Sequence, residues 1–129
     1  MLKSLNIKYF FLFITLAGML TACSNYNRIL KNGSVQEKYD LAKKYYNKKD
    51  YIKASPLFDD LLTYYRGTDS IEQIYYYYSY CKFGASEIDL ASYHFKNLYE
   101  TYPKGQFAEE AFYMYAYCEY LIAQPYYLD

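Results

Sequence analysis

The chain of 129 residues contains no tryptophan, one histidine, three prolines and five glycines. Its single histidine and three cysteines show none of the spacings typical of metal sites. The scattered glycines form no phosphate-binding loop. Basic and acidic residues balance at 14 each, so the positive excess typical of nucleic-acid-binding proteins is missing. We therefore predict no cofactor, no metal and no nucleic-acid partner.

Side chains that could perform catalysis are also sparse. His94 stands alone in a helical pattern, where a histidine is far more often a packed or surface residue than a catalytic one. The pairs Asp59-Asp60 and Glu109-Glu110 are adjacent, and neighbours on a helix do not face each other. Neither pair is therefore expected to form a converging carboxylate dyad, and we predict that the protein is not an enzyme.

No apolar run is long enough to cross a membrane. The longest extends from Tyr9 to Leu20, about a dozen residues, whereas a transmembrane helix needs roughly 20. The run follows Lys3 and Lys8, which is the layout of a secretory signal. It ends in the sequence Leu20-Thr21-Ala22-Cys23.

This ending resembles the lipobox of bacterial lipoproteins. The resemblance implies that residues 1–22 are a signal peptide and that fatty acyl chains such as palmitate are attached to Cys23. Two or more acyl chains anchor a protein stably to a membrane. Ser24, rather than an aspartate, follows the cysteine, which under the lipoprotein sorting rule implies the outer membrane. We expect a lipid-anchored protein at the periplasmic face of that membrane.

The charge is uneven along the chain. The segment from Arg28 to Lys53 holds eight basic and three acidic residues. Beside a lipid anchor such a segment could lie against anionic headgroups. A solvated, lysine-rich helix face explains the same pattern, and both interpretations remain open.

Tyrosine is abundant, at 22 residues, and its positions reveal a repeat of 37 residues. Residues 75–83, YYYYSYCKF, align with residues 112–120, FYMYAYCEY. Ala54, Phe58 and Leu61 recur one period later as Ala91, Phe95 and Leu98. Repeats of 20–50 residues are typical of solenoids and helical arrays. Two full repeats and the opening of a third fit into the chain.

Each repeat is predicted to contain two helices, because the apolar residues recur at helical spacing. Ser34 and Glu37 have the spacing of a capping box at the first helix. Pro56 is expected to remove one hydrogen bond and to kink its helix. After a linker at 23–33 we predict a solenoid over 34–129, with repeats at about 34–68, 69–105 and 106–129, the last incomplete. The expected helices are at about 34–48, 51–66, 70–84, 87–101 and 106–122.

The pattern resembles the tetratricopeptide (TPR) repeat, which implies an all-α, right-handed α-α superhelix of helical hairpins. In that family small residues lie where two helices cross and large ones fill the next packing position. The large positions here are Phe58 and Phe95, and Pro103 occupies the place of the family's proline. The chain departs from the family in its 37-residue period and in having no tryptophan at the early aromatic site. The small positions are Ala42, Ser79, Ala116, Ala54 and Ala91.

The repeat also bears on the cysteines. Cys81 and Cys118 are one period apart and so lie at equivalent positions on neighbouring helices. Packed helix axes are separated by about 8–10 Å, whereas a disulfide fails beyond about 7 Å between Cα atoms. We predict two buried free thiols.

The order of features resembles the BamD family, TPR lipoproteins of the outer-membrane β-barrel assembly machine. The run Tyr102 to Ala111 matches that family's Y-P-x-(G/S)-x-x-A-E-E-A pattern, and the resemblance covers essentially the whole chain. It implies an adaptor whose partners are the barrel insertase, other assembly-machine subunits and unfolded outer-membrane protein segments. The family carries about five repeats, so the chain is expected to be a fragment. Its last helix would then leave Phe112, Tyr115 and Leu121 exposed.

In TPR proteins the first helices of the repeats line a peptide-binding groove. Here they carry mostly aromatic rings with a few polar ends, a composition typical of binding hot spots. Any single tyrosine could equally pack between helices, but for the whole row we favour a groove. Carried over by the resemblance, the groove residues are Gln36, Tyr39, Lys43, Tyr46, Gln73, Tyr76, Tyr80, Phe83, Glu110, Tyr113, Tyr117 and Tyr120.

Two other functions fit parts of the pattern. A TPR lipoprotein that coordinates cell-envelope or division complexes would share the anchor and the repeats. A ligand-binding lipoprotein of nutrient uptake would need tryptophan to stack on sugars, and this chain has none.

Overall fold

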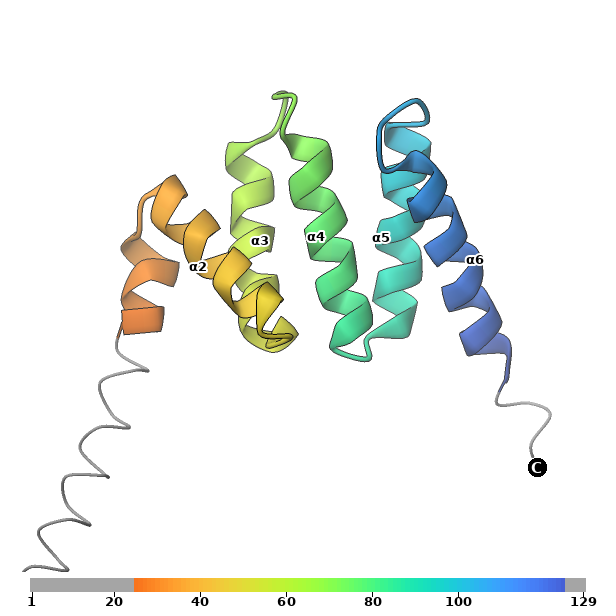
Figure 1. Cartoon of the computed structure of the whole chain (residues 1–129), viewed down its shortest axis with the longest axis horizontal. Coiled ribbons are helices and arrows are strands. Elements are labelled where there is room, and N and C mark those ends of the chain that lie inside the picture. The colour runs from red at the N-terminus through yellow and green to blue at the C-terminus, as the bar shows by residue number, and fades with distance from the viewer. Residues whose placement is uncertain (1–24, 125–129) are drawn as a thin grey trace, which may run out of the picture. The chain divides into compact units, whose positions relative to one another are not determined.

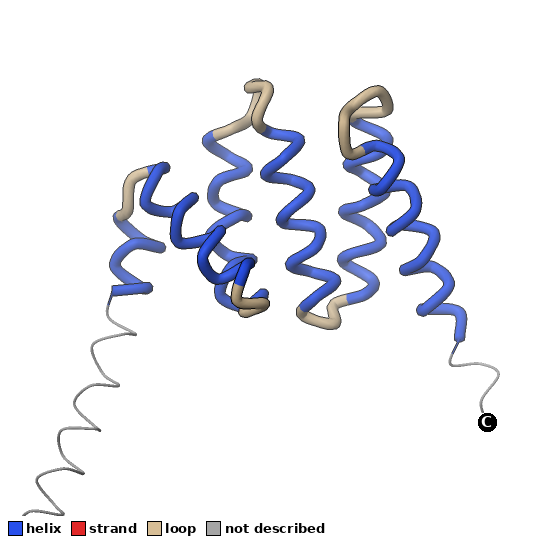
Figure 2. The backbone as a smooth tube through the Cα atoms, in the orientation of Figure 1, coloured by secondary structure: helices blue, strands red, loops and turns tan. Residues whose placement is uncertain are grey.

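A computed structural model describes residues 25–124 of the chain, and within this range it contains helices and no strand (Figure 2). The all-α prediction is confirmed, and each predicted helix end agrees to within two residues. Residues 25–32 are helical and belong to a separate unit that ends at Ser34. The signal peptide and Cys23 lie outside the described residues. The remaining helices are α2 (Val35–Asn47), α3 (Tyr51–Tyr64), α4 (Ile71–Gly84), α5 (Ile88–Thr101) and α6 (Ala108–Ala123).

The helices α2 to α6 pack in chain order, each against the next. Short connections join them at alternating ends, so that α3, α4, α5 and α6 run antiparallel side by side (Figure 1). The helix α3 continues through Pro56 to Tyr64, so this proline does not end it. From Val35 to Ala123 the chain is thus built of antiparallel helices, each packed on the next.

The 37-residue period is present in the backbone itself. The turn after α2 has Lys49 in the left-handed region at φ 59°, and the turn after α4 has Ser86 there at φ 64°. In each turn three N–H groups donate back to the preceding helix. The last of them is Asp50, which donates to Tyr45 at 2.9 Å, and its equivalent Glu87, which donates to Lys82 at 3.0 Å. The two turns are therefore equivalent in conformation, although only Asp50 and Glu87 are alike in sequence.

The connections between hairpins repeat in the same way. Tyr65 N–H donates to the Leu61 carbonyl, and Tyr102 N–H donates to the Leu98 carbonyl, both at 3.0 Å. Further bonds of the two loops also differ by one period, including those donated by Ile71 and Ala108. A period of 37 therefore describes both the hairpins and the loops that link them.

The buried core follows the predicted positions. Phe58 and Phe95 are fully buried, as are the small residues Ala42, Ser79, Ala54 and Ala91. Small side chains at these points allow helices to approach closely. Cys81 and Cys118 are buried free thiols, as predicted. Burial raises the pKa of Cys81 to about 12 and that of Cys118 to about 11.

The prediction for Ala116 is wrong, because this residue is exposed. It lies on a face of α6 that no other described helix covers, whereas its equivalent Ser79 is fully buried. Phe112 on the same helix is 52% exposed, as expected. Tyr115 and Leu121 are only half-buried, so the exposed face is narrower than predicted.

Lys38 occupies the early aromatic site of the first repeat and is only 4% exposed. Its ammonium forms an ion pair with Asp60 of α3 and lies 5.5 Å from the centre of the Tyr64 ring. The hydrogen bond to Asp60 raises the pKa of Lys38, although burial opposes it. A buried charge is tolerated when it is paired in this way.

We expect Asp60→Asn to lower the free energy of unfolding by about 2 kcal/mol, because Lys38 would keep a buried charge without its counter-ion. Breaking a fully buried pair costs roughly 3–5 kcal/mol, and the loss is smaller here because the Asp60 side chain is 38% exposed. The double variant Lys38→Met/Asp60→Asn is the control and should lose less than the single variant. Urea denaturation measures both, and equal losses would contradict the pairing.

Candidate functional site

The predicted groove residues lie on α2, α4 and α6, and side chains of these three helices contact one another in series. We call this set the aromatic stripe: Tyr39, Lys43, Tyr46, Gln73, Tyr76, Tyr80, Phe83, Glu110, Tyr113, Tyr117 and Tyr120.

Between α4 and α6 the contacts are direct. The hydroxyls of Tyr76 and Tyr80 both donate to Oε1 of Glu110, Tyr76 at 2.9 Å. The ring of Phe83 lies 6.0 Å from that of Tyr117. The structure therefore brings together members of the stripe that are about one period apart in the sequence.

Between α2 and α4 the contact passes through Tyr77, which was not among the predicted residues. Its ring lies 4.9 Å from Tyr46 and 5.7 Å from Tyr76. The Nζ atom of Lys43 lies 3.7 Å from the centre of the same ring. Tyr77 aligns with Asp40 and Met114 in the other repeats, so the 37-residue repeat does not predict an aromatic contact at this position.

Phe107 is a second contact residue that was not among the predicted ones. It precedes α6, and its ring stacks on Tyr76 with centroids 4.3 Å apart. Its N–H donates to Oε1 of Glu72 at 3.0 Å, which fixes the start of α6 against α4. The stripe is thus continuous from α2 to α6.

Three predicted residues are not joined to the rest. Tyr39 and Gln73 are half-buried, with no hydrogen bond or ring contact to another stripe residue. Gln36 donates instead to Asp40 of its own helix at 2.9 Å. From here on the aromatic stripe means the residues that are joined to one another. They are Lys43, Tyr46, Tyr76, Tyr77, Tyr80, Phe83, Phe107, Glu110, Tyr113, Tyr117 and Tyr120.

The members of the stripe differ in exposure. Half-buried rings pack between helices, whereas exposed rings are free to contact a ligand. Tyr46 is half-buried, and its ring contacts Tyr51, Phe58 and Tyr77 edge to face. Tyr113 on α6 is 65% exposed, and its ring is nearly parallel to that of Tyr117 at 6.4 Å. Rings on α2 and α4 thus build the surface, and rings on α6 offer contact area.

Burial also keeps the packed hydroxyls protonated. It raises the pKa of Tyr76 to about 12, with further contributions from the hydrogen bond to Glu110 and its charge. The same causes raise the pKa of Tyr80. Both hydroxyls donate to Oε1 of the Glu110 carboxylate, and its Oε2 accepts no hydrogen bond from another described residue.

A shallow hollow of about 420 Å³ lies beside this carboxylate. It is lined by Gln106, Glu109, Glu110 and Tyr113. The side chains of Glu109 and Glu110 both border this space. Two carboxylates, an amide and an aromatic ring suit a cationic side chain.

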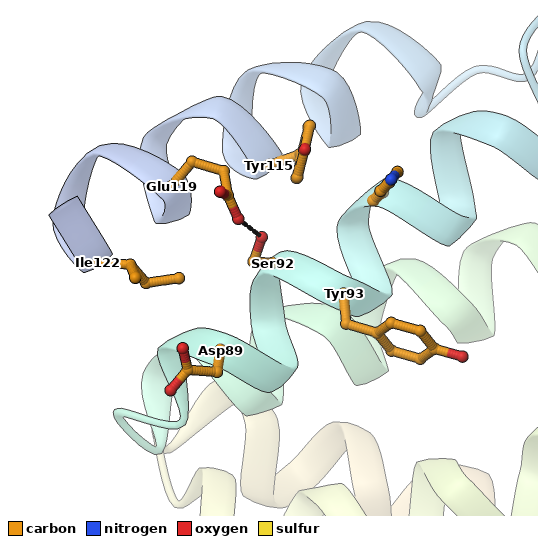
Figure 3. A pocket seen from close by; sticks show the side chains of 7 residues that line it. Asp89, Ser92, Tyr93, Tyr115, Glu119 and Ile122 are labelled. Atoms are coloured by element: carbon orange, nitrogen blue, oxygen red, sulfur yellow. Dashed lines mark hydrogen bonds between the residues drawn. The ribbon is translucent and has the colours of Figure 1, made fainter.

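A second hollow, of about 330 Å³, lies between α5 and α6 (Figure 3). Ser92 donates to Oε1 of Glu119 across it, and the side chains of Asp89 and Ile122 flank its other end (Figure 3). One period earlier, Tyr78 and Lys82 occupy the equivalents of Tyr115 and Glu119. In that earlier repeat, α5 and the turn that precedes it cover both side chains.

The cover in the earlier repeat is specific. The His94 ring lies 4.7 Å from Tyr78, and Glu87 pairs with Lys82 at 2.9 Å. His94 also forms a hydrogen bond with the Tyr75 hydroxyl, and burial lowers its pKa. The one histidine therefore packs against α4, and the second hollow lies where α5 and its leading turn cover the equivalent residues of the earlier repeat.

Within residues 25–124 no group of histidine, cysteine or acidic side chains could hold a metal ion. Over the same range no helix is both long and apolar enough to span a membrane. No protein-family model, curated protein or solved structure matches this chain.

Proposed function

We propose that the chain is a TPR solenoid of the BamD kind, a lipid-anchored adaptor that binds extended polypeptide segments during outer-membrane β-barrel assembly. The observation that carries the proposal is the aromatic stripe, a continuous row of rings on the first helices of successive hairpins. The repeated backbone hydrogen bonds support the hairpin architecture that such a groove requires. The lipobox-like Leu20 to Cys23 supports the anchor.

Physically, the stripe suits strands of barrel proteins. Such strands alternate apolar and polar side chains and carry aromatic residues near their ends. Exposed tyrosines such as Tyr113 and Tyr120 offer large contact areas with few rotatable bonds. Their hydroxyls can also bond the backbone of an extended segment. The protein would hold such a segment without performing any reaction.

We expect the double variant Tyr113→Ala/Tyr117→Ala to bind a barrel-strand peptide about tenfold or more weakly, because hot-spot tyrosines contribute about 1–2 kcal/mol each. Fluorescence anisotropy with a labelled synthetic peptide of alternating aromatic and polar residues measures the affinity. Tyr93→Ala on α5 is the control, since this tyrosine is 59% exposed and lies outside the stripe. Equal affinities for both variants would contradict the groove.

The adaptor role itself is tested by a pull-down from membranes with the lipidated protein. Recovery of a barrel insertase supports the proposal. Recovery of division or envelope-coordination proteins alone would instead favour the TPR lipoprotein of cell-envelope complexes.

A further inference from the structure

The aromatic stripe has a charged group of opposite sign at each end. Lys43 lies on α2 and Glu110 lies on α6. Between them Tyr77 contacts Lys43, Tyr76 contacts Tyr77, and the Tyr76 hydroxyl donates to Glu110. The two charges are thus fixed at the ends of one row of rings.

The ammonium of Lys43 is held in place but is not neutralised. It lies 3.7 Å from the centre of the Tyr77 ring and 5.6 Å from that of Tyr46. Within residues 25–124 it forms no ion pair, and the Asp40 carboxylate on the same helix already accepts from Gln36. A half-buried ammonium fixed over rings is a ready partner for a carboxylate.

The carboxylate of Glu110 is also held in place without a counter-charge. Two tyrosine hydroxyls fix its Oε1, and it forms no ion pair within the described range. The 420 Å³ hollow beside it places Glu109 and the Tyr113 ring within reach of the same ligand. Hydrogen bonds from neutral hydroxyls orient the carboxylate and leave its charge for a cation.

We infer that the stripe binds an extended polypeptide in one direction, with an acidic side chain or terminal carboxylate at Lys43 and a lysine or arginine in the hollow at Glu110. This inference rests on the proposed groove and adds the direction in which the segment lies in it. A uniform row of tyrosines would accept a segment in either direction, because each ring offers the same contact. The opposite charges remove that symmetry, since a reversed segment would bring like charges together at both ends.

The spacing of the two charges sets the length of the segment. The Nζ atom of Lys43 lies 3.7 Å from the centre of the Tyr77 ring, the Tyr77 and Tyr76 rings lie 5.7 Å apart, and the Tyr76 hydroxyl lies 2.9 Å from Oε1 of Glu110. Through these contacts the two charges are at most about 15 Å apart, and an extended chain rises about 3.3 Å per residue, so roughly four residues cover this span. The recognised segment therefore carries its acidic and basic groups about four residues apart, with aromatic residues between them.

A cross-linking experiment with the full chain tests the direction. Two synthetic peptides share one sequence, with an aspartate at one end, a lysine four residues away and aromatic residues between them. One carries a photo-reactive group beside the aspartate, and the other carries it beside the lysine. We expect the first to label α2 and the second to label α6, as read by mass spectrometry of the cross-linked fragments.

The charge exchange Lys43→Glu/Glu110→Lys should reverse the labelling, so that the aspartate end labels α6. The matched control Lys44→Glu/Glu100→Lys makes the same exchange at two exposed positions outside the stripe and should leave the wild-type pattern. Glu110→Gln alone should lower the affinity for the peptide about tenfold, because a charge-assisted contact is lost. Circular dichroism confirms that each variant keeps its helices.

The outcomes separate this inference from the proposed function. If both peptides bind but each labels α2 and α6 equally, the groove stands and its polarity is overturned. If the exchanged variant labels as the wild type does, the charges do not set the direction and the inference also fails. If neither peptide binds at all, the proposed groove itself is contradicted.

Discussion

Raising the pH from 9 to 12 should unfold the protein, while neutral solutions leave it intact. Burial raises the pKa of Tyr78 and of Tyr76 from 10.0 to about 12, and that of Cys81 from 9.0 to about 12. Burial also raises the pKa of Tyr46. The unfolded chain releases these protons at the ordinary values, whereas the folded chain keeps them.

The sign of the effect follows from this difference. A group with a raised pKa in the folded state contributes stability that is fully present below its unfolded pKa. That stability is lost as the pH rises through the folded pKa, here from about 9 for the thiols and 10 for the tyrosines up to about 12. Lys38 acts in the same direction above 10.5. Far-UV circular dichroism and tyrosinate absorbance, followed together, measure the transition.

A pair of tyrosine variants tests the cause. Tyr78→Phe removes a hydroxyl from a residue that is 7% exposed, so stability should fall less steeply with pH between 10 and 12. Tyr93→Phe removes an exposed hydroxyl and should leave the slope unchanged. Full helical signal at pH 12, with tyrosinate already formed near pH 10, would show that the buried hydroxyls do not oppose ionisation.

The helices and the core were predictable because both depend on local spacing. Phe58 and Phe95, and Ala54 and Ala91, occupy equivalent places in a repeat, and equivalent places fold alike. The wrong prediction for Ala116 has a different origin. Its sequence position matches Ser79, but its burial depends on a covering helix, which an alignment within the chain does not supply.

The candidate site was predictable only in part for the same reason. The period located Tyr76, Tyr80 and Glu110 on equivalent faces, but not the hydrogen bonds that join them across two helices. Tyr77 and Phe107 connect the stripe although neither has an equivalent of its own kind in the other repeats. Contacts that differ between repeats depend on particular side chains in three dimensions, and repetition in the sequence cannot reveal them.

Phe95→Ala should lower the free energy of unfolding by about 3–5 kcal/mol, because it leaves a cavity in a fully buried position. The ring packs in the core that includes Leu98, Met114 and Cys118, where α5 meets α6. It also contacts Tyr80 edge to face, with centroids 5.0 Å apart. Tyr80 would lose this support, so the affinity of the stripe for peptide should fall along with stability. Urea denaturation and peptide anisotropy measure the two effects.

Phe112→Ala is the matched control, because it removes the same side chain from a position that is 52% exposed on the adjacent helix. Its ring contacts Tyr99 at 5.0 Å but fills no core position, so the expected loss is below about 1 kcal/mol. A loss from Phe112→Ala as large as that from Phe95→Ala would mean that the outer face of α6 is packed in solution. The Phe95 result alone decides whether the α5–α6 core supports the stripe. If Phe95→Ala destabilises the fold while peptide affinity stays unchanged under conditions where the variant is folded, Tyr80 is positioned by Glu110 and Tyr76 rather than by the core.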